Sequence, residues 1–466
     1  ASSSALPAEY AGLSEEEKIN VLTGITSTVD KIPSDNPVHT DIFASVKAIK
    51  DIQHFNGEAG CNRYIISQCN SALNVMEVYG LFLLNGWQKE NMSIDIVPLF
   101  ETIDDLQNAS DVMKTLYSNE VYAAHLKRRN LSQTIMLGFS DGTKDGGYLM
   151  ANWSIYKAKE ELTAISKQYN IEVVFFDGRG GPPSRGGGKT HKFYASMGQN
   201  ISNEEIQLTV QGQTVSSNFG TVDAAQYNIE QLLHAGISND LFNNREITLE
   251  KEEENLLEEL ATASFKKYVS LKEHPYFADY LSQVSPLKFY SQTNIGSRPA
   301  KRSGDSKLSL KDLRAIPYVG AWAQLKQNVT GYFGVGTALM QMEKEGKFEQ
   351  LKTLYHNSLF FKTLLDNSEM AMKKCFFPLT EFLSKDEKYG EIWNIIHNEY
   401  LLTRQYVLKL SDKTDLMSDY SVEQLSINMR ERIVLPLLTI QQFAISNIRV
   451  IEDNLVNSPL KETYEK

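Results

Sequence analysis

The chain has 466 residues, enough for more than one domain, and its apolar and charged fractions of 42% and 23% are ordinary for a globular protein. Its net charge of −11 provides no general basic surface for a nucleic acid or a membrane, so neither is an expected partner.

Three further features of the sequence favour a cytoplasmic protein. The cysteines Cys61, Cys69 and Cys375 have neither the spacing of a zinc site nor that of a disulfide framework. The first residues lack the charged and apolar regions of a signal peptide. No apolar run reaches the roughly 20 residues that a membrane span needs.

Residues 1–37 are expected to form a polar entry segment. Ser14 and Glu17 have the spacing of a capping box, which predicts a short helix that ends before Pro33 and Pro37.

Residues 38–340 are expected to form the main α/β region. Short apolar runs alternate there with amphipathic stretches such as residues 153–169, which we interpret as a helix. The clearest runs are residues 96–100, 134–139 and 171–176. They are rich in β-branched and aromatic residues, so the alternation predicts repeated β-α units and a parallel sheet or barrel.

The β-α alternation extends to about residue 240, and the chain beyond that point is expected to be mostly helical. Residues 249–268 place leucines and aromatic residues along one face at helical spacing. Residues 341–466 are predicted to form a separate region of long helices, with breaks at 384–386 and 411–412.

Each of the three apolar runs is followed by an acidic residue: Glu101, Asp141 and Asp177. Because the carboxyl ends of barrel strands meet at one face, these carboxylates would converge there. They would repel one another without a cation, and Mg²⁺ suits one or two carboxylates completed by water and substrate oxygens. Alternatively, each acid only caps the helix that follows its strand.

A glycine-rich segment, residues 177–191, follows the third run. It ends in Gly-Lys-Thr, as a phosphate-binding P-loop does, but Pro183 stands where the first glycine is required. Arg179 and Arg185 lie within it, and the planar guanidinium suits phosphate or carboxylate. We interpret the segment as an anion-binding loop, and a flexible linker is the alternative.

Six segments together resemble the phosphoenolpyruvate carboxylase family, in the order and at the spacing of that family. They are residues 98–109 (PLFETIDDLQNA), 137–147 (LGFSDGTKDGG), 177–188, 209–213 (TVQGQ), 295–302 (IGSRPAKR) and 313–322 (LRAIPYVGAW). The resemblance implies an α-rich α/β protein, with a (β/α)8-type barrel surrounded and followed by many helices. It also implies carboxylation of phosphoenolpyruvate by bicarbonate to oxaloacetate and phosphate, via carboxyphosphate and a metal-stabilised enolate.

The resemblance also implies roles for individual residues. Glu101 and Asp141 correspond to the family's ligands for Mg²⁺ or Mn²⁺. Arg179 and Arg298 correspond to arginines that hold the substrate phosphate. Arg185 corresponds to an arginine near the carboxylation site.

Three further positions complete the expected site. Lys144 corresponds to the lysine of the metal-ligand motif, and Asp177 lies where the family has a catalytic histidine. Lys374 and Arg430, together with Arg185, correspond to the residues that bind feedback dicarboxylates.

The chain departs from the family pattern in three respects. A histidine is replaced by Asp177, and an arginine upstream of residues 295–302 is replaced by Ser282. Both ends are short, because an amino-terminal half with further catalytic residues and a final carboxyl-terminal segment are expected to flank the chain. We therefore expect negligible activity from these 466 residues alone and a homotetramer for the intact enzyme.

Two alternatives remain. The protein could be a catalytically impaired relative that binds metabolites or regulates, which the substitutions at Asp177 and Ser282 favour. It could instead be a structural helical interaction module, although such a module does not need arginine pairs in a glycine-rich loop.

Overall fold

The computed structural model describes residues 6–29, 36–241, 248–292 and 313–453. Two compact units are present, and the chain passes between them several times. Unit 1 comprises residues 1–138, 155–178 and 200–208, and unit 2 comprises residues 139–154, 179–199 and 209–466.

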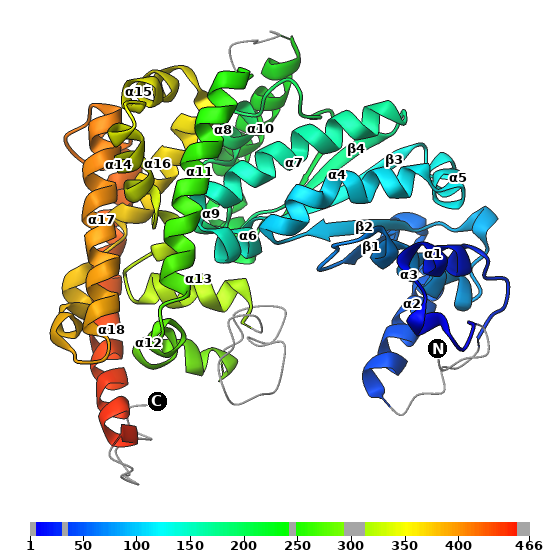
Figure 1. Ribbon diagram of the computed structural model, residues 1–466, viewed down its shortest axis with the longest axis horizontal. Helices are drawn as coiled ribbons and strands as arrows, with labels where there is room; N and C mark the ends of the chain where they lie inside the picture. Colours follow the sequence, from blue (N-terminus) through cyan, green and yellow to red (C-terminus); the bar gives the residue numbers. More distant parts are fainter. Residues whose placement is uncertain (1–5, 30–35, 242–247, 293–312, 454–466) are drawn as a thin grey trace. The chain divides into compact units, whose positions relative to one another are not determined.

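Unit 1 is built on a parallel sheet (Figure 1). Its strands pair in the order β1-β2-β3-β4-β5. The strands are β1 (Arg63–Ile66), β2 (Asp95–Phe100), β3 (Ser132–Gly138), β4 (Glu172–Gly178) and β5 (Ile206–Leu208). The three predicted apolar runs are β2, β3 and β4, so the prediction of β-α units in a parallel sheet is confirmed. Closure of the sheet into a (β/α)8 barrel stays a prediction.

Helices pack on the strands of unit 1, because each strand is largely buried and needs apolar cover. α3 and α4 contact β2, and α5 contacts β3. The helices are α1 (Glu15–Thr23), α2 (Pro37–Asn56), α3 (Ala72–Leu84), α4 (Ile103–Ser118), α5 (Glu120–Arg128) and the second part of α7 (Tyr148–Gln168). The predicted capping box of Ser14 and Glu17 begins α1, and Pro37 is the first residue of α2.

Unit 2 is helical over its described residues (Figure 1). Its first α-helices are α6 (Phe139–Gly146), the start of α7, α8 (Thr190–Ala195), α9 (Gly212–Phe219), α10 (Val222–Leu241), α11 (Lys251–Lys272), α12 (Phe277–Val284) and α13 (Ala315–Gln324). They are followed by α14 (Val335–Lys344), α15 (Phe348–Asn357), α16 (Leu359–Lys373), α17 (Gly390–Ser411) and α18 (Ser421–Asp453). The predicted breaks at 384–386 and 411–412 fall at the ends of η8 (Phe377–Lys385) and α17.

The core of unit 2 is rich in aromatic residues. Trp322 is fully buried and lies 5.8 Å from the ring of Phe277 and 6.1 Å from that of Tyr280. This cluster joins α12 and α13 to the later helices through Phe377 and Trp393, whose rings are 5.8 Å apart. It anchors α13 next to α6, the helix that carries Asp141.

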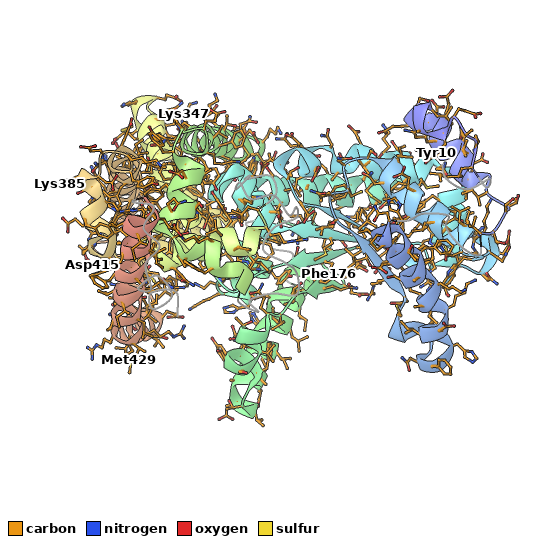
Figure 2. All side chains as sticks on the ribbon, turned by 90° about the horizontal axis from the view of Figure 1, so that it is seen from below. Tyr10, Phe176, Lys347, Lys385, Asp415 and Met429 are labelled. Atoms are coloured by element: carbon orange, nitrogen blue, oxygen red, sulfur yellow. The ribbon has the colours of Figure 1, made fainter. Side chains whose placement is uncertain are left out.

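One helix differs from the others in its surface. α18 presents a row of exposed apolar side chains, including Met429 (Figure 2). Of its most apolar stretch of 18 residues, only 17% is buried. By length and composition it could cross a membrane, but packed helices of soluble proteins also meet those two criteria. The expectation of no membrane partner therefore stays a prediction.

Candidate active site

The carboxyl ends of β2, β3 and β4 lie in register. Phe100 of β2 pairs with Leu137 of β3, and Leu137 pairs with Asp177 of β4. Glu101 is the residue after Phe100, so Glu101 and Asp177 lie at the same end of the sheet. Glu101 is 7% exposed, and its carboxylate accepts a hydrogen bond of 2.8 Å from the backbone N–H of Gln68. A side chain at Gly138 would come within 3.2 Å of Glu101, so glycine leaves room for this carboxylate.

The alternative that these acids are only helix caps does not hold for Glu101. Thr102 is the N-cap residue of α4, and Asp105 completes its capping box. Asp177 lies inside β4 rather than at a helix start. Asp141 does occupy the first turn of α6, where a carboxylate is favoured by the helix dipole.

Asp177 faces the helix layer of unit 1. Its Oδ2 atom accepts a hydrogen bond of 2.8 Å from the Nζ atom of Lys159, and the two side chains are 0% and 2% exposed. Lys159 belongs to α7, and its ammonium lies 5.0 Å from the centre of the Phe175 ring. Because alternate residues of a strand share a face, Asp177 and Phe175 both point toward α7.

Asp141 and Arg185 lie close together in unit 2. The Arg185 guanidinium donates to the hydroxyl of Ser140 at 3.0 Å and to the side-chain oxygen of Gln211 at 3.1 Å. Burial lowers the pKa of Arg185, and the negative charge of Asp141 opposes that shift. A half-buried carboxylate therefore stands beside the arginine expected near the carboxylation site.

Lys144 lies one turn further along α6. Its Nζ atom donates to the carbonyl oxygen of Leu313, and its own carbonyl accepts from the hydroxyl of Tyr268 at 3.2 Å. These contacts hold α6 between α11 and the start of α13.

The glycine-rich segment is a folded loop, so the flexible-linker alternative is wrong. Within it, the N–H of Gly180 donates to the carbonyl of Arg185 at 2.5 Å, and that of Gly187 donates to Pro182 at 2.9 Å. A Cβ atom at Gly187 would lie 1.9 Å from the carbonyl oxygen of Gly181. Only glycine permits that close approach.

Arg179 is packed against aromatic rings of unit 2 and is 4% exposed. Its guanidinium carbon lies 3.9 Å from the centre of the Phe193 ring and 5.4 Å from that of Phe139. Stacking at this distance uses the flat face of the guanidinium, and the N–H donors lie in its plane. Rings from α6 and α8 thus orient the group expected to hold phosphate.

Lys374 and Arg430 are close enough in unit 2 for their charges to interact, and the binding of an anion there stays a prediction. Burial lowers the pKa of Lys374, and the positive charges of Arg430 and Lys326 lower it further, while Glu431 acts in the opposite direction. Glu431 forms an ion pair of 2.6 Å with Lys326. A cavity of about 360 Å³ adjoins this cluster and is lined by Glu431, Arg404 and Asp415 among others.

Two further expectations have different outcomes. Arg298 lies outside the described residues. His191, the histidine at the end of the glycine-rich segment, is the nearby residue that could replace the histidine missing at Asp177. It is half-buried, and its pKa is lowered by burial and then by Lys189 and Lys192.

The donor chemistry suits a magnesium or manganese ion. Glu101 and Asp141 each offer carboxylate oxygens, and two carboxylates leave coordination positions for water and substrate. Glu101 belongs to unit 1 and Asp141 to unit 2, so their convergence stays a prediction. No group of three histidine, cysteine, aspartate or glutamate residues that could hold a metal occurs within the described ranges.

Lys159 was not predicted from the sequence as part of the site. A signal was present, because Lys159 shares its helix face with Ile155, Tyr156 and Leu162, all of which are buried. A lysine among apolar residues of a helix is rarely buried without an acidic partner. That partner, Asp177, is 18 residues further along the chain and could not be identified from helical spacing.

Fold and site together define a helix-rich α/β protein with carboxylates at strand ends and an ordered, arginine-bearing glycine loop. The family profile of phosphoenolpyruvate carboxylase matches residues 2–464. The chain therefore belongs to the phosphoenolpyruvate carboxylase family.

Individual relatives agree with this assignment. The phosphoenolpyruvate carboxylase of Corynebacterium glutamicum is 33% identical over 456 residues, which cover 93% of this chain and 49% of the relative. That of Prochlorococcus marinus subsp. pastoris is 33% identical over 483 residues, which cover 99% of this chain and 48% of the relative. That of Trichormus variabilis is 32% identical, with 97% and 48% covered. The chain thus spans about half the length of these relatives.

Proposed function

We propose that this chain forms the carboxyl-terminal catalytic part of an enzyme that carboxylates phosphoenolpyruvate with bicarbonate. Membership of the family carries the proposal, and the arrangement of Arg179, Arg185 and Asp141 supports it. A bicarbonate oxygen attacks the phosphorus, and the bond from phosphorus to the enol oxygen breaks. The products of this step are carboxyphosphate and the enolate of pyruvate. Carboxyphosphate then splits into carbon dioxide and phosphate, and the enolate carbon attacks carbon dioxide to form oxaloacetate.

The residues of this chain would bind and orient the anions in that sequence. Arg179 and Arg298 would hold the phosphate, whose oxygens gain charge as it is transferred. Arg185 would lie at bicarbonate and carbon dioxide, and the loop that carries it would keep water out. Lys144 and Asp177 would complete the site, and Glu101 and Asp141 would hold Mg²⁺ or Mn²⁺. When bound, that ion supplies positive charge beside the oxygens that become negative.

Regulation and assembly are also proposed. Lys374 and Arg430, with Arg185, would bind feedback dicarboxylates, which the proximity of Lys374 to Arg430 supports. The intact enzyme would be a cytoplasmic homotetramer. Dicarboxylate titration and light scattering of the full natural protein test these two points.

The decisive experiment measures oxaloacetate formation by the full natural protein, coupled to malate dehydrogenase and NADH. Turnover that requires Mg²⁺, phosphoenolpyruvate and bicarbonate together would support the carboxylase, whereas we expect negligible turnover from these 466 residues alone. A folded protein that binds phosphoenolpyruvate without forming oxaloacetate would instead be the impaired relative. Failure to bind either Mn²⁺ or phosphoenolpyruvate would favour a helical interaction module.

A further inference from the structure

The buried ion pair of Lys159 and Asp177 lies at the stem of the anion-binding loop. Asp177 is the penultimate residue of β4, and Arg179 is only two residues further along the chain. In an extended strand two residues span roughly 7 Å. The backbone positions of Asp177 and of the arginine proposed to hold phosphate are therefore no more than about 7 Å apart.

A carboxylate at this position presents an electrostatic problem. Phosphoenolpyruvate carries a phosphate and a carboxylate, so a buried negative charge near its binding loop would repel it. The Asp177 side chain is fully buried, which means that water does not screen its charge well. The 2.8 Å contact with the Lys159 ammonium makes the pair formally neutral.

The same contact fixes the end of β4 in place. Lys159 ties Asp177 to α7, while the next residue, Gly178, packs against β3. A side chain at Gly178 would lie 3.0 Å from the carbonyl oxygen of Leu137, so the strand end has little room to shift. Helix and neighbouring strand thus hold the residue that precedes Arg179 from two sides.

We propose that Lys159 is a positioning residue for the anion-binding loop. It neutralises the charge of Asp177, so that a carboxylate can stand where the family has a histidine without weakening phosphoenolpyruvate binding. This inference rests on the proposed function, because it takes phosphoenolpyruvate as the ligand of the loop.

Three variants of the full natural protein, which differ in the net charge of the Lys159 and Asp177 pair, test the proposal. Lys159→Met leaves the pair position with charge −1, Lys159→Met with Asp177→Asn leaves 0, and Asp177→Asn alone leaves +1. Isothermal titration calorimetry with phosphoenolpyruvate and Mg²⁺, without bicarbonate, measures binding in the absence of turnover. Lys157→Met is the matched control, because Lys157 lies on the same helix and pairs with Glu160 at 2.6 Å.

The dissociation constant for phosphoenolpyruvate is expected to rise as the net charge of the pair becomes more negative. Lys159→Met should raise it about 10-fold, the double variant should return it to within about threefold of wild type, and Asp177→Asn should leave it equal or lower. Lys157→Met should change it less than twofold. A purely structural role would instead weaken binding in all three variants of the pair.

Two results would overturn the inference. One is a folded Lys159→Met protein that binds phosphoenolpyruvate as well as wild type. The other, which remains decisive even if that variant does not fold, is weaker binding by Asp177→Asn than by wild type. If wild type itself does not bind phosphoenolpyruvate, the proposed function fails, and that outcome is distinct from both.

Discussion

The phenolic oxygens of Tyr268 and Tyr318 lie 2.7 Å apart in the core of unit 2. Tyr268 belongs to α11 and Tyr318 to α13, and both side chains are at most 1% exposed. Because Tyr268 also donates to the carbonyl of Lys144, this pair connects two core helices to α6. The position of Asp141 on α6 therefore depends on packing far from it in the sequence.

Removal of the Tyr268 hydroxyl should destabilise unit 2 more than removal of the Tyr318 hydroxyl. Tyr268→Phe takes the partner from both Tyr318 and the Lys144 carbonyl, which we expect to cost about 2 kcal/mol in the free energy of unfolding. Tyr318→Phe leaves the bond to Lys144 in place and should cost about 1 kcal/mol. Denaturant unfolding of both variants measures the difference, and equal costs would contradict it.

Two glycines with the same φ angle allow a matched test of the loop. Gly186 and Gly346 both have φ of +75°, where an L side chain is strained. A Cβ atom at Gly186 would lie 2.5 Å from the Phe139 ring, whereas one at Gly346 meets nothing within 4 Å. Gly346→Ala should cost about 1 kcal/mol of stability, and Gly186→Ala about 1 to 3 kcal/mol more.

The same two variants separate stability from binding. Phe139 is one of the rings that packs on Arg179, so Gly186→Ala should also weaken phosphoenolpyruvate binding by the full natural protein. Gly346→Ala should leave that binding unchanged. Calorimetric titration of both variants provides the comparison, and equal affinities would show that the loop tolerates displacement of Phe139.

Acid should destabilise unit 1 through His125. Burial, followed by the charges of Arg128 and Arg129, lowers the pKa of His125 from 6.5 to about 4. Between pH 6.5 and 4 the unfolded chain binds a proton that the folded chain does not, so the free energy of unfolding falls as pH falls. At pH 4 the free energy of unfolding should be about 3 kcal/mol lower than at neutral pH because of this group.

A variant without this titrating group isolates its contribution. The stability of His125→Gln should fall less steeply over that pH range than that of wild type. His54→Gln, at an exposed position, is the control for the loss of a histidine. Urea unfolding at several pH values measures the slopes, and parallel curves for wild type and His125→Gln would refute the prediction.

The two faces of α18 should respond differently to the same chemical change. Leu437 and Ile440 are 62% and 67% exposed, whereas Ile445 is 4% exposed. Replacing both exposed residues by Gln should change stability by no more than about 0.5 kcal/mol and should lower the binding of an apolar dye. Ile445→Gln should cost about 3 kcal/mol, because it buries an amide in an apolar contact. A large loss of stability on replacing Leu437 and Ile440 would show that other parts of the protein cover this face of α18.

The strands and the site segments could be predicted from local patterns. β2, β3 and β4 are short apolar runs bounded by polar residues, and two arginines among glycines led to the prediction of an anion-binding loop after β4. β1 and β5 have only four and three residues, too few for a reliable pattern, and were not predicted. Helix boundaries near 384–386 and 411–412 were predicted because polar residues interrupt the apolar spacing there.

By itself the sequence determined the family, the parallel β-α units and the residue types at the ends of the strands, because motif order, apolar spacing and turn residues are local properties. Only the tertiary structure decided the partners of those residues. The pairing of Lys159 with Asp177, the stacking of Arg179 on Phe193 and the contact of Tyr268 with Tyr318 join separate elements. Such contacts depend on strand register, helix rotation and the room left by glycines. These are set by the packing of the whole core, so no single segment encodes them.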